Sequence, residues 1–102
     1  MNARDWWKTM KKLTLQTIDA CWVCGDTKNL HTHEVFFGSA NRKKSIEYGL
    51  QVKLCGYHHN LSNKGVHHNK TLDLLLKKYA QTKFEEIYGH EKFMEVFHKS
   101  YI

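Results

Sequence analysis

The sequence predicts an α+β fold, organised as a single domain over residues 1–102. Apolar and polar residues alternate across residues 50–54, which is the period of a half-buried strand. Apolar residues recur at intervals of three and four across residues 71–88, which is the period of an amphipathic helix. A chain of 102 residues is long enough for one modest core.

The chain opens with an amphipathic pattern. Trp7 and Ile18 fall at helical spacing with lysines between them, which predicts an N-terminal helix within residues 1–19. We expect residues 20–70 to form the central unit and residues 71–102 to form two C-terminal helices.

The central unit begins with two strand signals. Residues 30–37 are β-rich, and the second strand is the alternating segment 50–54. The polar and basic stretch 38–47 between them reads as a loop, so we expect an antiparallel hairpin. Residues 56–64 then predict a short helix that stops at Gly65.

Two helices are predicted at the C-terminal end. The long helix over residues 71–88 ends at Gly89, a residue typical of helix termini. A last short helix follows over residues 91–99, with Phe93, Met94 and Phe97 directed toward the core.

The chain is basic, with 16 Lys and Arg against 10 Asp and Glu and a formal charge of +6. This balance favours an anionic partner, most commonly nucleic acid. No apolar run approaches the roughly 20 residues that span a bilayer. The opening residues lack the apolar stretch of a signal peptide, so we expect a cytoplasmic protein without membrane contact.

The cysteines form a metal-ligand pattern. Three cysteines cannot pair fully, which argues against a disulfide framework. Cys21-x-x-Cys24 and Cys55-x-x-His58 each present two ligands on one turn, and three cysteines with one histidine form a common closed zinc set. We therefore predict a structural Zn²⁺. The alternative is that the three cysteines pack as small buried hydrophobes.

A second group of histidines predicts a second centre. Neighbours on a helix point about 100° apart, so His59 cannot comfortably share the ion of His58. His67 follows Gly65 and could fold back beside His59, and His33 lies in the first predicted strand. The expected arrangement is one closed site and one open site.

These motifs resemble those of the HNH endonucleases, whose ββα-metal unit combines a Cys-x-x-Cys knuckle with a histidine-bearing hairpin and helix. The closest likeness is to small phage proteins described as recombination-enhancement, RecA-dependent nucleases. The resemblance covers about Cys21–Ile102. It rests on the segments CWVCG (21–25), LHTHEVFFG (30–38), GLQVKLCGYHHN (49–60) and VH (66–67), and on FFGSANR (36–42) and FMEVFHKSYI (93–102).

The resemblance implies roles for individual residues. His33 matches the first-strand ligand of a catalytic cation, His59 matches the helix histidine, and His67 matches a further ligand. Glu34 stands where many relatives carry the histidine that serves as general base. The asparagine of the family name is missing, since Tyr48 and Gly49 occupy its expected place.

Phosphodiester hydrolysis needs a cation to neutralise developing charge and a base to take a proton from water. The cation could be Mn²⁺, Ni²⁺ or Zn²⁺, which suit imidazole ligands, or Mg²⁺, which relatives use. Glu34 and His31 are both candidate bases. On a regular strand His31 shares a face with His33, whereas Glu34 points to the opposite face.

The resulting hypothesis is a metal-dependent endonuclease that acts on DNA, and the resemblance implies that it is phage-encoded and works in a bacterial cytoplasm. Arg42, Lys43 and Lys44 would contact the phosphate backbone, and RecA-type filaments are possible partners. One alternative is a non-catalytic zinc module that binds nucleic acid or a recombination protein. Another is a structural zinc protein with an interface at Trp6 and Trp7.

Overall fold

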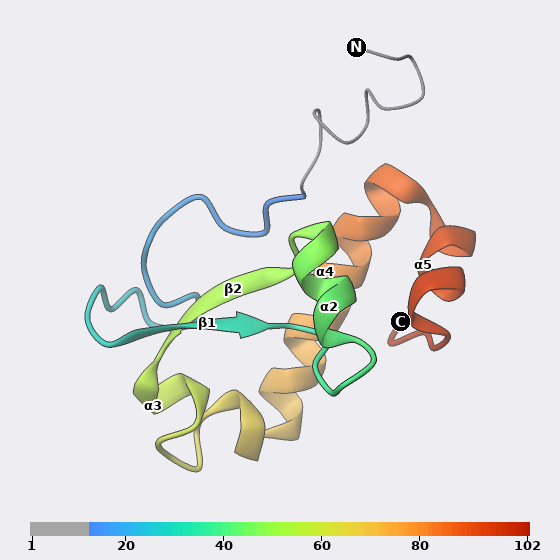
Figure 1. Cartoon of the computed structure of the whole chain (residues 1–102). Helices are drawn as coiled ribbons and strands as arrows, with labels where there is room; N and C mark the ends of the chain where they lie inside the picture. The colour runs from blue at the N-terminus through green and yellow to red at the C-terminus, as the bar shows by residue number, and fades with distance from the viewer. Residues whose placement is uncertain (1–12) are drawn as a thin grey trace.

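The computed structural model describes residues 13–102 and confirms an α+β fold with a two-stranded sheet (Figure 1). Strands β1 (Leu30–Glu34) and β2 (Gln51–Cys55) pair antiparallel, as predicted, with Leu30 opposite Cys55 and Glu34 opposite Gln51. Within the described residues, no helix is both long and apolar enough to span a bilayer.

The connection between the strands is not the predicted loop, because it contains helix α2 (Arg42–Tyr48). Ser45 fixes this helix against the chain that leaves β1. Its buried hydroxyl donates to the Phe36 carbonyl at 2.6 Å and accepts from the Phe36 amide at 3.1 Å. The helix ends at Gly49, whose φ of 73° is a left-handed conformation that glycine adopts without a Cβ clash.

Four helical segments follow β2, which are α3 (Gly56–His59), η2 (Val66–His68), α4 (Lys70–Tyr88) and α5 (His90–Phe97). The first is shorter than the predicted helix over 56–64. The long helix agrees with the prediction: the Asn69 side chain caps its start by accepting from the Leu72 amide, and it ends before Gly89. The last helix ends two residues earlier than predicted.

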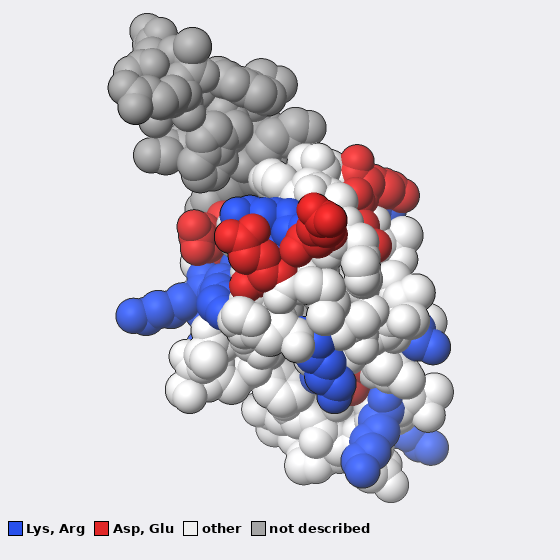
Figure 2. Space-filling model, turned by 90° about the vertical axis from the view of Figure 1, so that its right-hand side faces the viewer, with Lys and Arg blue, Asp and Glu red and all other residues white. Residues whose placement is uncertain are grey.

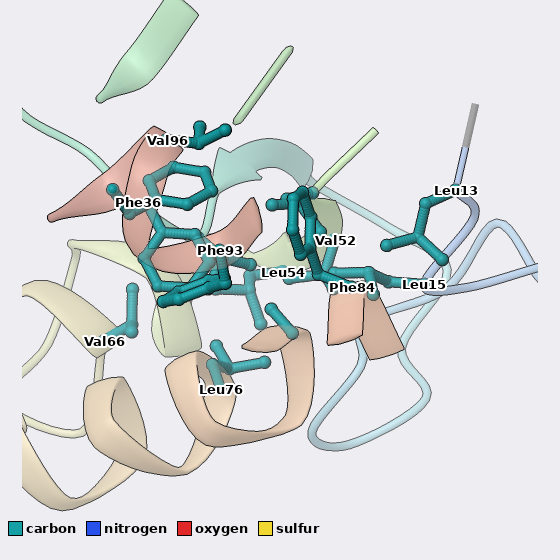
Figure 3. Close-up of a cluster of buried hydrophobic side chains, with 14 of the residues drawn as sticks. Leu13, Leu15, Phe36, Val52, Leu54, Val66, Leu76, Phe84, Phe93 and Val96 are labelled. Carbon is teal, nitrogen blue, oxygen red and sulfur yellow. The ribbon is translucent and has the colours of Figure 1, made fainter. Parts of the chain in front are cut away.

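Aromatic and aliphatic side chains from β2, α4, α5 and the chain just after β1 meet in one core (Figure 3). Phe36, Phe84 and Phe93 are almost fully buried, and their ring centroids lie 5.4 Å apart in the Phe36–Phe93 and Phe84–Phe93 pairs. The apolar pattern across residues 71–88 also includes Leu75 and Ile87, but both side chains are exposed, so the buried face of α4 is narrower than that pattern.

The predicted N-terminal helix lies mostly outside the described residues, together with Trp6, Trp7 and Met10. The described part, residues 13–19, is not helical, so that part of the prediction is wrong. Leu13 and Leu15 are buried, but Ile18 is 70% exposed. This segment instead follows the outer edge of β2, where the Gln16 side chain accepts from the Lys53 amide at 2.8 Å.

Candidate metal centres

Cys21, Cys24, Cys55 and His58 converge into one cluster whose ligand atoms all lie within 4.8 Å of one another. The first two come from the turn before β1, Cys55 ends β2, and His58 lies on α3. The Cys24 and Cys55 sulfurs are 3.8 Å apart, and the His58 Nδ1 lies 3.3 Å from Cys55 Sγ and 3.8 Å from Cys21 Sγ.

These separations fit a tetrahedral metal ion. Zinc binds sulfur at about 2.3 Å and nitrogen at about 2.0–2.1 Å, which places tetrahedral ligands about 3.6–3.8 Å apart. The two separations of 3.8 Å match those edges, and the 3.3 Å between His58 Nδ1 and Cys55 Sγ is slightly shorter. The cluster could therefore bind a metal such as zinc.

Backbone amides favour the thiolate form of Cys21, which is the form that binds a cation. Burial alone raises the pKa of Cys21, but the amides of Cys55, Cys24 and Val23 oppose it and lower that pKa to about 6. The Asp26 amide lowers the pKa of Cys24, yet burial and the neighbouring thiols outweigh it and the Cys24 pKa is raised. Neighbouring thiolates repel each other, and a bound dication would offset that repulsion.

His33, His59 and His67 form a second cluster, with one ring nitrogen of each within 4.8 Å of the others. The His59 and His67 Nε2 atoms are 3.1 Å apart. His33 is 2% exposed, and its buried Nε2 has no hydrogen-bond partner among the described residues. Imidazole nitrogens bound to one cation at about 2.0–2.1 Å stand about 2.8–3.4 Å apart, for angles between 90° and the tetrahedral value, so these three side chains could hold a metal ion.

The surroundings of His33 and His59 favour the neutral imidazole, which is the form that binds metal. Burial lowers the pKa of His33 to about 3, with further contributions from His67, His59 and Lys77. Burial also lowers the pKa of His59, assisted by His67 and His31, while Glu34 acts in the opposite direction. Protons therefore compete weakly with a cation at His33.

Glu34 and Arg42 lie beside this histidine cluster. Both line a hollow of about 320 Å³ together with His33, His59 and His67. The Arg42 Nε donates to Glu34 Oε1 at 2.8 Å, and the carboxylate side chain is only 11% exposed whereas the Arg42 side chain is 69% exposed. Strand alternation placed Glu34 on the opposite face from His33, but at the end of β1 both residues reach the same hollow.

His31 lies behind the cluster rather than in the hollow. Its Nδ1 is 2.8 Å from the Nδ1 of His59, on the ring edge away from the Nε2 that approaches His67. The two rings meet edge to face at 88°. His31 therefore contacts one ligand of the cluster and is not among the residues that line the hollow.

The three basic residues of α2 have different surroundings. Arg42 reaches the hollow, Lys43 is exposed, and the Lys44 ammonium donates to the Val96 carbonyl near the end of α5. Figure 2 views the molecule from the α5 side, where acidic side chains gather on the upper part and basic ones are scattered. Among residues 13–102, that face therefore offers no continuous basic surface.

Sequence reasoning missed Phe37 and Lys77 as neighbours of the histidine cluster. The Phe37 ring lines the hollow, with its centroid 5.0 Å from that of His67. The Lys77 ammonium lies 4.4 Å from the centroid of Phe37 and 2.8 Å from Asp73 Oδ2. Only the spacing of Asp73 and Lys77 by four residues, which suits a helical ion pair, was visible in the sequence.

A larger hollow of about 620 Å³ lies between residues 13–19 and β2. None of the predicted site residues lines it, so we do not take this larger hollow as the candidate functional site. The two clusters lie elsewhere, and the adjacent residues His58 and His59 belong one to each.

Comparison of the chain with protein-family models, with curated proteins and with solved structures finds no match.

Proposed function

We propose that the protein is a metal-dependent endonuclease that hydrolyses phosphodiester bonds in DNA. The observation that carries this proposal is the meeting of His33, His59 and His67 with Glu34 and Arg42 around one hollow. Three imidazoles, a carboxylate and a guanidinium are the groups that hydrolysis of a phosphodiester requires: cation ligands, a base and an anion-binding donor.

In this proposal the histidines hold one divalent cation, which could be Mg²⁺, Mn²⁺, Ni²⁺ or Zn²⁺. When bound, it neutralises charge that develops on the phosphate and the leaving oxygen. His33 is rigidly held by burial, whereas His67 is exposed and leaves the hollow open toward substrate. Imidazole ligands favour Mn²⁺, Ni²⁺ or Zn²⁺ over Mg²⁺, which prefers oxygen.

Glu34 is the proposed general base and Arg42 the proposed phosphate contact. The ion pair between them holds the carboxylate beside the hollow that both residues line. A phosphate that enters can draw the exposed Arg42 side chain to itself, because a guanidinium binds a phosphate with two parallel hydrogen bonds. Glu34 is then free to accept a proton from water.

The Cys21, Cys24, Cys55 and His58 cluster is assigned a structural Zn²⁺. All four ligands are protein side chains in a closed set, the arrangement typical of structural zinc. Because His58 and His59 are consecutive on α3, a zinc held by His58 also fixes the position of His59. The resemblance to HNH endonucleases supports the same division between a structural and a catalytic centre.

The test compares His59→Ala with His58→Ala in the full-length protein. Cleavage of supercoiled, linear and single-stranded DNA, with and without RecA-type filaments, is measured in Mg²⁺, Mn²⁺ and Ni²⁺. We expect His59→Ala to abolish cleavage while keeping the melting temperature and one bound zinc. We expect His58→Ala to lower both the melting temperature and the zinc content.

The matched control is His68→Ala, which removes an exposed histidine beside His67 and should leave cleavage and stability unchanged. If the wild-type protein cuts none of these DNA forms with any of the metals, the endonuclease proposal fails.

A non-catalytic module that binds nucleic acid or a recombination protein is the second candidate. The observation that favours it is that Glu34 already has a partner in Arg42, so the carboxylate is not free in this structure. This candidate is supported if the protein binds DNA in a salt-dependent way and takes up metal at the histidine cluster, yet leaves every DNA form intact.

A further inference from the structure

We propose that His31 is a positioning residue that fixes the tautomer of His59. It does so by accepting a hydrogen bond from the His59 Nδ1–H, which leaves the His59 Nε2 lone pair free for a cation. This inference rests on the metal-binding part of the proposed function and on no step of DNA cleavage.

The geometry sets the two ring nitrogens of His59 to different tasks. Its Nε2 faces His67 Nε2 at 3.1 Å, and its Nδ1 faces His31 Nδ1 at 2.8 Å. A neutral imidazole carries one proton, on either Nδ1 or Nε2. The proton of the His59–His31 bond therefore decides whether the nitrogen directed at the cluster carries a lone pair or a hydrogen.

Only one of the two arrangements suits metal binding. If His59 donates from Nδ1, then its Nε2 is unprotonated and can bind a cation. If His31 donates instead, then neutral His59 carries its proton on Nε2, which blocks that atom as a ligand. Metal-binding histidines commonly donate their second N–H to a fixed acceptor, and His31 occupies the place of that acceptor.

The fold holds His31 at this position. It lies on β1 opposite Leu54 of β2, and β2 leads directly into α3, which carries His59. The acceptor and the ligand are therefore fixed relative to each other by the hairpin and the short helix that follows. This assignment also separates the two candidate bases: the His31 Nδ1 is engaged with His59, whereas Glu34 lines the hollow.

The first experiment measures the tautomer directly. Long-range ¹H–¹⁵N NMR spectra of the zinc-loaded full-length protein, without added second metal, report which His59 nitrogen carries the proton. We expect protonation at Nδ1 in the wild type and a shift toward Nε2 in His31→Leu. A wild-type protein with His59 protonated at Nε2 would overturn the proposal, whatever its activity on DNA.

The second experiment measures Co²⁺ affinity of the histidine cluster in the same zinc-loaded protein, from visible absorption. His31→Leu removes the acceptor and should weaken Co²⁺ binding about 10–100-fold, the usual effect of losing an outer partner of a ligand. His31→Asn places an amide oxygen near the former Nδ1 and should restore most of the affinity. Zinc content and melting temperature show that each variant folds.

The outcomes separate this inference from the proposed function. If His31→Leu binds Co²⁺ as well as the wild type, or His31→Asn is as weak as His31→Leu, the positioning role is wrong even if DNA is cut. If the tautomer and the affinities follow the expectation but no DNA is cleaved, the positioning role stands and the endonuclease proposal fails. If the wild type takes up no Co²⁺ at the cluster, both fail.

Discussion

At the scale of single residues, the position of Glu34 has the largest consequence. It is the last residue of β1, it lines the hollow of the histidine cluster, and its carboxylate is mostly buried. Arg42 holds this carboxylate through Oε1, so the proposed proton transfer from water depends on the ion pair opening or on the other oxygen, Oε2. Its role therefore depends on contacts that no local sequence pattern reveals.

The substitution Glu34→Gln tests the proposed role of Glu34 as general base. The amide keeps the size and the hydrogen-bonding reach of the side chain but cannot accept a proton. We expect cleavage to fall about 10²–10⁴-fold, the usual contribution of a general base, with no loss of Co²⁺ binding or melting temperature. If Glu34→Gln cleaves at the wild-type rate while His31→Ala is inactive and still binds Co²⁺, then the base is His31 and this assignment is wrong.

The basic residues of α2 are expected to differ from one another when each is neutralised to Gln. Arg42→Gln should weaken DNA binding and reduce the slope of its salt dependence by roughly one unit per lost phosphate contact. Lys44→Gln should mainly reduce stability, because Lys44 bonds the Val96 backbone. Fluorescence anisotropy over a salt series measures the first effect, and thermal unfolding measures the second.

Lys43→Gln is the matched control, since Lys43 is exposed on the same helix. Equal losses of DNA affinity in all three variants would contradict the division of roles and would favour a uniform basic surface on α2.

At the scale of elements, the connection from α3 to η2 decides whether His59 and His67 meet. The backbone returns on itself at Gly65, where a Cβ atom would lie 2.6 Å from the His59 carbonyl oxygen and 2.8 Å from its carbon. These neighbours are backbone atoms, which cannot move aside as a flexible side chain can. Gly65 is therefore needed for close approach between the two segments and not for an unusual φ.

Gly65→Ala should consequently push η2 away from α3. We expect weaker Co²⁺ binding at the histidine cluster, by about tenfold or more, since a displaced ligand loses much of its interaction with the cation. The zinc content should stay at one ion, because the ligands of the cysteine cluster precede Gly65. Lys64→Ala, at the exposed neighbouring position, is the control and should bind Co²⁺ normally. Unchanged affinity in Gly65→Ala would show that the turn has room to adjust.

At the scale of the whole molecule, the same segment, the end of β2 and the helix α3, carries ligands of both clusters. Cys55 ends β2 and is followed at once by α3, which carries His58 for one cluster and His59 for the other. Core side chains of α4 and α5 belong to the same buried cluster as those of β2, where Leu54 is fully buried next to Cys55. Loss of the cysteine cluster should therefore disturb the histidine cluster and the hairpin together.

Removal of the proposed structural zinc tests this dependence. Metal binding contributes about 10–16 kcal/mol to folding of zinc-finger peptides, whereas whole domains are stable by only about 5–15 kcal/mol. We therefore expect Cys55→Ser, or treatment with a strong chelator, to unfold the domain or lower its melting temperature by many degrees. Circular dichroism and metal analysis measure both effects. A Cys55→Ser protein that melts like the wild type with one zinc bound would remove the structural assignment.

The sequence by itself determined the features that depend on neighbours along the chain. The spacing of apolar residues predicted α4 and β2, and the two Cys/His pairs predicted ligands that the fold brings into one cluster. The adjacency of His58 and His59 already implied two centres, because consecutive residues on a helix point in different directions. Each of these patterns lies within a short stretch of sequence, so it can be recognised without knowing how the remaining chain folds.

Only the tertiary structure decided the contacts that join distant segments. The fold turned the expected loop into α2 through the bonds of Ser45 to Phe36, and it brought Glu34 into the hollow beside Arg42. It also set His31 against His59, 28 positions apart along the chain. Such contacts depend on how strands and helices pack, and that packing depends on the whole chain. The periodicity of apolar residues indicates only which face of a single helix or strand is buried.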